Sequence, residues 1–226
     1  MPRNVKQPEW MWIRIFSAIG LFLACFCYTY VYYKQLHKNG GILSVSAASQ
    51  HPVAFVWQAI IVNIPIIIFL SLSFVVCRKK ATDNLSLTLG KKSAKITVLV
   101  LGLVYILSLV RQLLVHDDGT VILLKWVYYL VFVAFCEELE FRALLPAILK
   151  DRCNKYVEWL LPNVLFACAH LLLPLVQGKS VEELLWILGN TIVGYVILGL
   201  FWEWCKRKSG SLWVGVLLHA IMDFGI

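Results

Sequence analysis

A short run of ionisable residues interrupts a mostly apolar stretch at positions 121–149. It reads Cys136-Glu137-Glu138-Leu139-Glu140-Phe141-Arg142. Placing one charged side chain near the centre of a lipid bilayer costs from roughly 3 to more than 10 kcal/mol. These side chains are therefore expected to face the protein interior and to mark a functional site. The alternative is a structural cluster of ion pairs that holds neighbouring helices together.

Helical spacing separates the roles of the two adjacent glutamates. Glu138 and Arg142 are four residues apart, so they share one face of a helix and can form an ion pair. Glu137 lies about 100° around the helix from Glu138, because a helix has about 3.6 residues per turn. It is left without the arginine, and we expect its carboxylate to face a cavity.

Two further polar pairs with the same spacing occur in later apolar runs. Phe166 is four residues before His170, and His219 is four residues before Asp223. At a rise of about 1.5 Å per residue, four ionisable side chains lie about 12 to 21 Å deep when counted from one side of the membrane; they are Glu137, His170, His219 and Asp223. Polar groups from three helices are thus predicted to meet in one layer within the bilayer.

Composition and hydropathy predict the elements that must position these side chains. The 226 residues are 60% hydrophobic and only 15% charged, which is typical of a protein that crosses the membrane many times. About 20 apolar residues are needed for each span. We therefore predict an all-α fold, a polytopic transmembrane helical bundle of about seven spans, at 12–33, 53–77, 96–115, 121–149, 156–176, 183–203 and 211–226.

The distribution of basic residues predicts the orientation in the cell membrane. Most lie in the N-terminal tail and in the loops after the second, fourth and sixth spans: Arg3, Lys6, Arg78, Lys79, Lys80, Lys91, Lys92, Lys95, Lys150, Arg152, Lys155, Lys206, Arg207 and Lys208. The opposite side carries only Lys34, Lys38, Arg111 and Lys179. Because cytoplasmic loops are enriched in Lys and Arg, we expect a multi-pass protein with a cytoplasmic N-terminus and the C-terminus outside. The basic loops are thus expected to contact the lipid bilayer, and no nucleic-acid partner is predicted.

The order and spacing of the motifs resemble one family of membrane proteins. Glu-Glu-x-x-x-Arg at Glu137, Phe-x-x-x-His at Phe166 and His-x-x-x-Asp at His219 each lie on a late predicted span. In this respect the chain is similar to the CPBP family, the type II CAAX prenyl endopeptidases and the Abi-type or bacteriocin-processing intramembrane proteases. The resemblance implies a CPBP-like catalytic core of four spans at 121–226. The three N-terminal spans within residues 1–120 carry no motif.

The resemblance also implies a role for each position. Glu137 and His170 would activate a water molecule for attack on a peptide carbonyl. Glu138 and Arg142 would be a supporting pair. His219 and the residue four positions later would stabilise the oxyanion or orient the reacting groups. Hydrolysis independently requires a base close to a water molecule and a donor where negative charge develops.

One position departs from the common family pattern, which has Asn where this chain has Asp223. An ionised carboxylate only accepts hydrogen bonds, so Asp223 would hold the tautomer of His219 or help to ligate a metal. The motifs require no cofactor, and the resemblance leaves metal-dependent and glutamic-protease mechanisms both open. A divalent metal such as zinc would take N and O ligands from Glu137, His170, His219 and Asp223.

We therefore predict an intramembrane endopeptidase that hydrolyses a peptide or protein substrate. By resemblance, this substrate is a prenylated CAAX protein or, in the bacterial branch, a peptide of bacteriocin processing or self-immunity. The rival interpretation is a non-catalytic membrane immunity or scaffold protein, in which the polar layer serves helix packing. An ion transporter is disfavoured because the polarity is confined to the late spans. No oligomeric state is predicted.

Overall fold

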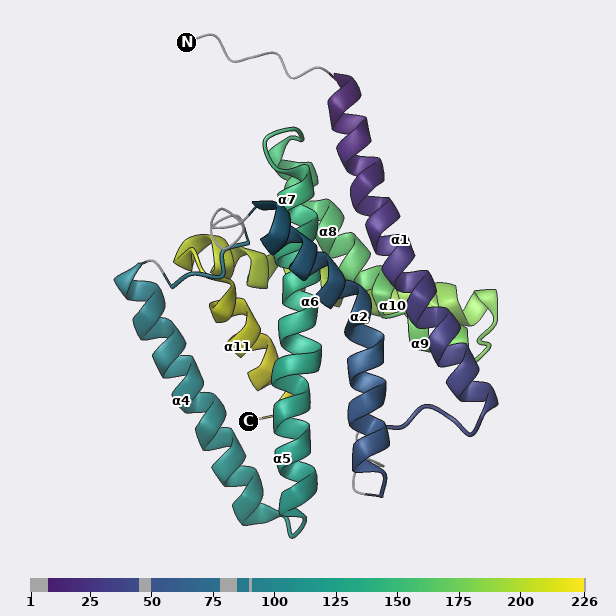
Figure 1. Cartoon of the computed structure of the whole chain (residues 1–226), viewed down its shortest axis with the longest axis vertical. Helices are drawn as coiled ribbons and strands as arrows, with labels where there is room; N and C mark the ends of the chain where they lie inside the picture. Colours follow the sequence, from purple (N-terminus) through teal and green to yellow (C-terminus); the bar gives the residue numbers. More distant parts are fainter. Residues whose placement is uncertain (1–7, 45–49, 78–84, 90, 226) are drawn as a thin grey trace.

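The regular structure consists of helices. The protein is described by a computed structural model over residues 8–44, 50–77, 85–89 and 91–225 (Figure 1). Within these ranges there is no β-strand. The separate helices are α1 (Pro8–Lys38), α2 (Pro52–Cys77), α4 (Lys92–Val115), α8 (Lys155–Ala169), α9 (Leu172–Val176), α10 (Val181–Ser209) and α11 (Leu212–Phe224), together with one long composite helix at Gly119–Leu149.

Six segments of the described chain are long and apolar enough to cross a membrane. They are Trp10–Lys38, Pro52–Leu72, Lys92–Val115, Gly119–Leu149, Lys155–Val176 and Val181–Ser209. The predicted all-α membrane bundle is confirmed. The last predicted segment, 211–226, is the shorter helix α11 of 13 residues. At about 1.5 Å per residue it reaches only ~20 Å, less than the ~30 Å of a hydrocarbon core. Five basic residues of the topology argument lie outside the described residues: Arg3, Lys6, Arg78, Lys79 and Lys80.

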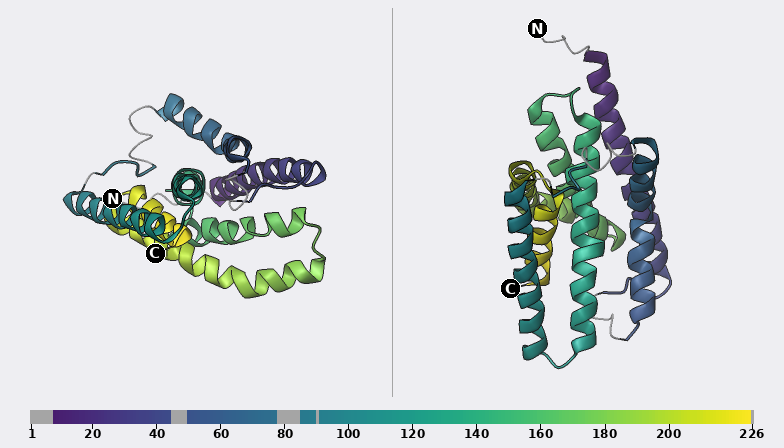
Figure 2. Two further views of the ribbon diagram at one scale, coloured as in Figure 1. Left: turned by 90° about the horizontal axis from the view of Figure 1, so that it is seen from below. Right: turned by 60° about the vertical axis from the view of Figure 1, so that its left-hand side comes forward.

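The composite helix lies at the centre of the bundle. Seen along its axis, it is surrounded by the other helices (Figure 2, left), and it packs against α1, α2, α4, α8, α10 and α11. It carries the Glu-Glu-x-x-x-Arg motif. Its segments are α5 (Gly119–Val127), η2 (Tyr128–Phe135), α6 (Cys136–Glu138), η3 (Leu139–Leu144) and α7 (Leu145–Leu149), of which η2 and η3 are π-helical.

Two buried apolar clusters flank the composite helix. One joins it to α4 and α11 through residues such as Leu139, Tyr105 and Val216. The other joins it to α1, α8 and α10 and includes Phe141 and Phe166. Because apolar side chains cover the central helix on both sides, its buried charged side chains Glu138, Glu140 and Arg142 lie between the two clusters.

Proline four residues after a functional side chain shapes the backbone at two places. A proline lacks the N–H that would bond to the carbonyl four residues earlier, and its ring clashes with that carbonyl. Pro146 has this relation to Arg142, and the widened π-helical turns of η3 precede it. Pro174 has it to His170, and the predicted continuous span 156–176 is interrupted by a turn at His170 and Leu171.

A proline in a helix leaves the carbonyl four residues earlier without its usual N–H donor. A neighbouring helix can supply a donor in its place. Pro65 lies within α2, and the carbonyl four residues earlier belongs to Ile61. The Tyr28 hydroxyl on α1 donates a hydrogen bond of 3.0 Å to this oxygen. Within a membrane such replacement is required, because lipid offers no hydrogen-bonding partner.

Candidate active site

His219 on α11 lies between two carboxylates. Its Nδ1 is 3.1 Å from Glu138 Oε1, and its Nε2 is 3.3 Å from Asp223 Oδ2. Both contacts are hydrogen bonds at once only if His219 is doubly protonated or one carboxyl carries a proton. Glu138 has no exposed surface and His219 is only 3% exposed. The sequence analysis paired Glu138 with Arg142 alone, so the contact with His219 is an addition to the predicted arrangement.

Glu137 lies between this cluster and a cavity. Its Oε2 is 3.8 Å from His219 Nε2, and its side chain remains 33% exposed. Asp223 Oδ2 approaches the same nitrogen at 3.3 Å, and the Phe166 ring contacts the rings of both His170 and His219. The four predicted site residues therefore surround one region of the structure, although they come from the central helix, the end of α8, and α11.

Two aromatic residues of α10 hold the two histidines. The Tyr195 ring stacks on His170 with centroids 3.7 Å apart, and the Trp202 ring stacks on His219 at 4.1 Å. Phe166 meets both histidine rings edge to face, at 4.8 and 6.4 Å. Sequence analysis did not identify Tyr195 and Trp202. Their seven-residue spacing, which places two large aromatic side chains on one face of a helix, is the signal that was available.

Arg142 is completely buried. Its Nη1 is 3.6 Å from Glu138 Oε1, and its guanidinium lies 4.1 Å from the Phe166 ring centroid and 5.2 Å from that of Trp202. Its nitrogens make no side-chain or backbone hydrogen bond among the described residues. One carboxylate and two aromatic faces therefore balance the positive charge.

Two glycines leave room for the buried ion pair. A Cβ atom at Gly199 on α10 would overlap the side-chain oxygen of Asn163 and would lie 2.8 Å from Arg142 Nη2. A Cβ atom at Gly215 on α11 would lie 2.9 Å from Glu138 Oε2. Helices in membranes commonly approach one another closely at small residues. Here the small residues admit charged side chains of the neighbouring helix.

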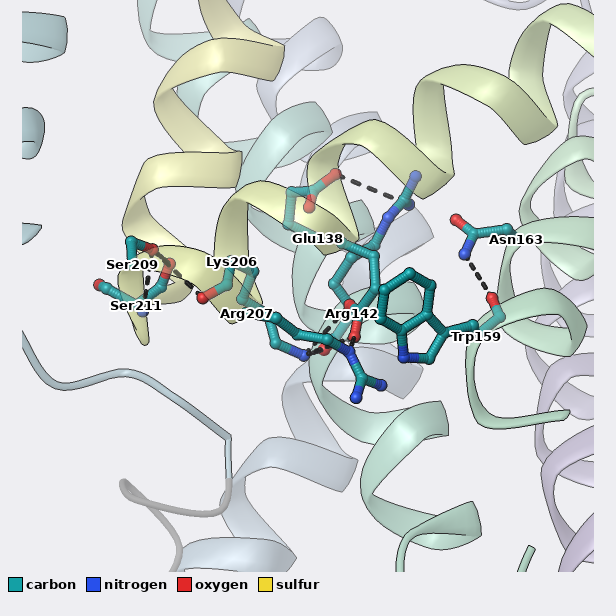
Figure 3. A network of polar contacts seen from close by, with 9 residues as sticks. Glu138, Arg142, Trp159, Asn163, Lys206, Arg207, Ser209 and Ser211 are labelled. Carbon is teal, nitrogen blue, oxygen red and sulfur yellow. Dashed lines mark hydrogen bonds and ion pairs between the residues drawn. The ribbon is translucent and has the colours of Figure 1, made fainter. Parts of the chain in front are cut away.

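A second buried polar group supports the motif from α10 (Figure 3). The Lys206 ammonium donates to the backbone oxygen of Arg142, the carbonyl that Pro146 cannot serve. Lys206 Nζ is 3.2 Å from Glu203 Oε2, and Arg207 Nε is 2.5 Å from Glu203 Oε1. Glu203 is 1% exposed. These residues were assigned to loops and span ends in the sequence analysis, which could not show that they reach the motif.

A cavity of about 220 Å³ adjoins the cluster. It lies between α1, α2 and the central helix, and apolar and aromatic side chains form most of its walls. Two carboxylate residues of the central helix line it, Glu137 and Glu140. The cavity therefore offers an apolar substrate chain a place beside Glu137.

The donors of the cluster fit a metal centre only in part. Among the described residues, no three His, Cys, Asp or Glu side chains are grouped so that they could hold an ion. The ring nitrogens of His219 lie 3.1 and 3.3 Å from carboxylate oxygens. His170 Nδ1 lies 3.0 Å from the Phe166 carbonyl oxygen, and when Nδ1 donates there, the lone pair of Nε2 is free.

The apolar helices are typical of a multi-pass membrane protein, and a cluster of glutamate and histidine side chains lies between the late helices. Residues 119–225 match the family described as type II CAAX prenyl endopeptidase Rce1-like. The match covers slightly less than half of the chain, and the predicted resemblance to CPBP intramembrane proteases is confirmed. Comparison with curated proteins and with solved structures gave no match.

Gly199 and Gly215 face the buried ion pair, and an added methyl group at either position is expected to destabilise the protein. Gly199→Ala and Gly215→Ala should each lower the free energy of unfolding by about 1–3 kcal/mol, because overpacking displaces buried side chains. Gly189 and Gly194 on α10 have no atom within 4 Å of an added Cβ. Their Ala variants should be neutral or stabilised by up to about 1 kcal/mol. Thermal unfolding in detergent measures the difference, and equal effects at all four positions would contradict the packing argument.

A double-mutant cycle tests whether Lys206 replaces the missing N–H of Pro146. Lys206→Met should lower the free energy of unfolding more in the wild-type background than in the Pro146→Ala background. In the Pro146→Ala variant, the backbone N–H of residue 146 can donate to the Arg142 carbonyl. The expected coupling is about 1.5–3 kcal/mol, the net value of a hydrogen bond that involves a charged group. Arg207→Met is the matched control, since Arg207 also pairs with Glu203 but makes no bond to the Arg142 carbonyl. A coupling of zero for Lys206, or an equal coupling for Arg207, would count against the replacement.

Proposed function

We propose that the protein is an intramembrane endopeptidase whose site comprises Glu137, His170, His219 and Asp223, with Glu138 and Arg142 as supporting residues. One observation carries the proposal: Glu137 lines the cavity and at the same time lies 3.8 Å from His219. The family match over residues 119–225 supports a protease. An ion-pair cluster that served packing alone would give no reason for a carboxylate to face a cavity.

Glu137 acts as the general base in this mechanism. With His170 it binds a water molecule and removes one proton as the oxygen attacks the carbonyl carbon of the scissile peptide. A carbon–oxygen bond forms and the carbonyl becomes an oxyanion. The tetrahedral intermediate collapses by breaking the carbon–nitrogen bond, and the proton held by Glu137 passes to the leaving amine. General acid–base catalysis of this kind contributes about 10²- to 10⁴-fold.

His219 is the donor to the developing oxyanion through its Nε2–H, which lies on the side of Glu137, and the oxyanion then accepts this hydrogen bond in place of Asp223. The position of His219 is fixed by Glu138 at Nδ1, by Asp223 near Nε2, and by the stacked Trp202 ring. A donor held in place before the reaction needs no reorganisation as charge develops. Asp223 thus positions the imidazole, which is a role open to a carboxylate as well as to the Asn common in the family.

The substrate class follows from the family description and from the cavity. The family is named for prenyl endopeptidases, and the largely apolar walls beside Glu137 suit a lipid-modified or otherwise hydrophobic peptide. We propose a prenylated CAAX-type peptide as the first substrate to test. An unmodified hydrophobic leader peptide, as in bacteriocin processing, is the second arm of the same assay.

Replacing the proposed base is expected to abolish cleavage. Glu137→Gln and His170→Ala should each lower kcat for a farnesylated CAAX-type peptide by about 10²- to 10⁴-fold, because the water is no longer activated. Glu182→Gln is the control, since Glu182 is an exposed acidic residue in the first turn of α10. Peptide cleavage by purified protein in detergent is the measurement. Full activity of Glu137→Gln would exclude this residue as the base.

The proposed orientation has the N-terminus and the loop around Lys155 in the cytoplasm, with the loop at Lys179 outside. In intact cells, a membrane-impermeant maleimide should label Lys179→Cys above the background of the parent protein. Lys155→Cys should react only after permeabilisation. Both side chains lie at exposed positions, so access to the reagent depends on the side of the membrane. The reverse labelling pattern would invert the topology.

A further inference from the structure

Glu140 is a buried carboxylate that the proposed mechanism does not use. It is 8% exposed and lines the same cavity as Glu137. Across the described residues, no hydrogen bond or ion pair reaches its carboxyl group, and its charged neighbour in the cavity is Glu137, a like charge. The one buried guanidinium nearby, that of Arg142, faces Glu138 and α10.

An unpaired carboxylate in an apolar membrane site is costly, and such residues mark places where a partner binds. Three other polar side chains of the cavity are already engaged elsewhere, and the tyrosines Tyr33 and Tyr128 also line it. Thr29 donates to the Cys25 carbonyl, Gln58 bonds both backbone groups of Leu43, and Asn63 donates to two carbonyls. Two carboxylates therefore face the cavity, and none of its other lining residues carries a positive charge.

We propose that Glu140 forms a cation-binding subsite, which takes the ammonium or guanidinium group of a basic residue next to the scissile bond of the substrate. This inference rests on the proposed protease function and adds a specificity determinant to it. A carboxylate between apolar walls attracts a positive group strongly, because little water screens the charge. The neutral part of such a side chain would lie along the walls formed by α1 and α2.

The position of the subsite follows from the helix. Glu140 is three residues after Glu137, which corresponds to a rise of about 4.5 Å along the central helix. An extended peptide advances about 3.3 Å per residue. A substrate whose scissile carbonyl lies at Glu137 would therefore present to Glu140 a side chain from within one or two residues of the cleaved bond.

Paired peptides test the subsite. Each pair of farnesylated CAAX-type peptides keeps the farnesylated cysteine and differs only by Lys or norleucine at one other position within two residues of the scissile bond. At one of these positions the wild-type protein should prefer Lys by about tenfold or more in kcat/KM, equivalent to about 1.4 kcal/mol. Glu140→Gln should bring this ratio close to one, Glu140→Asp should retain part of it, and the control Glu182→Gln should retain all of it.

A binding measurement separates failure of the subsite from failure of the protease assignment. The same peptides are added to two proteins without the proposed base, the single variant Glu137→Gln and the double variant that also carries Glu140→Gln. The rise in melting temperature on peptide binding is measured for each protein. If Lys peptides stabilise only the first protein while wild type cleaves nothing, the subsite stands and the protease proposal is wrong. If neither assay shows a Lys preference that depends on Glu140, the subsite is overturned. An equal loss of kcat on both peptides of every pair would also overturn it, since Glu140 would then act in the chemical step.

Discussion

The burial of the Arg142 guanidinium is the constraint on which the arrangement of the late helices depends. A charge with no exposed surface in an apolar bundle must be balanced by groups brought to it, because lipid supplies none. Glu138 comes from the same helix, Phe166 from α8 and Trp202 from α10. Once these groups surround the arginine, α8 and α10 are fixed relative to the central helix, and the α10 rings Tyr195 and Trp202 stack on the two histidines.

Glu138 links this structural requirement to the chemistry. The same Oε1 atom that is 3.6 Å from Arg142 is 3.1 Å from His219 Nδ1. The carboxylate is thus shared between a cation that holds helices together and an imidazole in the proposed site. Removing one partner of a buried ion pair leaves the other charge uncompensated. This usually costs more stability than replacing both partners with apolar residues.

The sequence predicted those features that depend on spacing within one helix or on hydropathy along the chain. The membrane helices follow from apolar runs, and the pairing of Glu138 with Arg142 follows from their four-residue separation. Contacts between helices have no such signature. Tyr195, Trp202 and Lys206 could not be connected with the motif, because their partners lie on helices whose relative rotation the sequence does not specify. The last predicted segment contains helix α11, which has 13 residues and ends at Phe224 before Gly225.

Prolines explain part of what periodicity could not predict. Pro146 and Pro174 each stand four residues after a side chain of the proposed site, Arg142 and His170. At each place the regular helix is modified, by a wide turn in one case and by an interruption in the other. A proline in a membrane helix marks a kink or an end of that helix. The four-residue separation between each proline and the polar residue before it indicates that the helix is disturbed at the backbone carbonyls of Arg142 and His170.

The π-helical segments on both sides of Cys136–Glu138 have a consequence for how such a site can evolve. A hydrogen bond to the fifth residue instead of the fourth means that each such turn accommodates one more residue than an α-helical turn. A single-residue insertion can therefore be absorbed locally, with a rotation of the short segment between the two wide turns. In related chains, the direction of Glu137 and Glu138 could be adjusted by gaining or losing one residue on either side, while the rest of the span kept its packing against the surrounding helices.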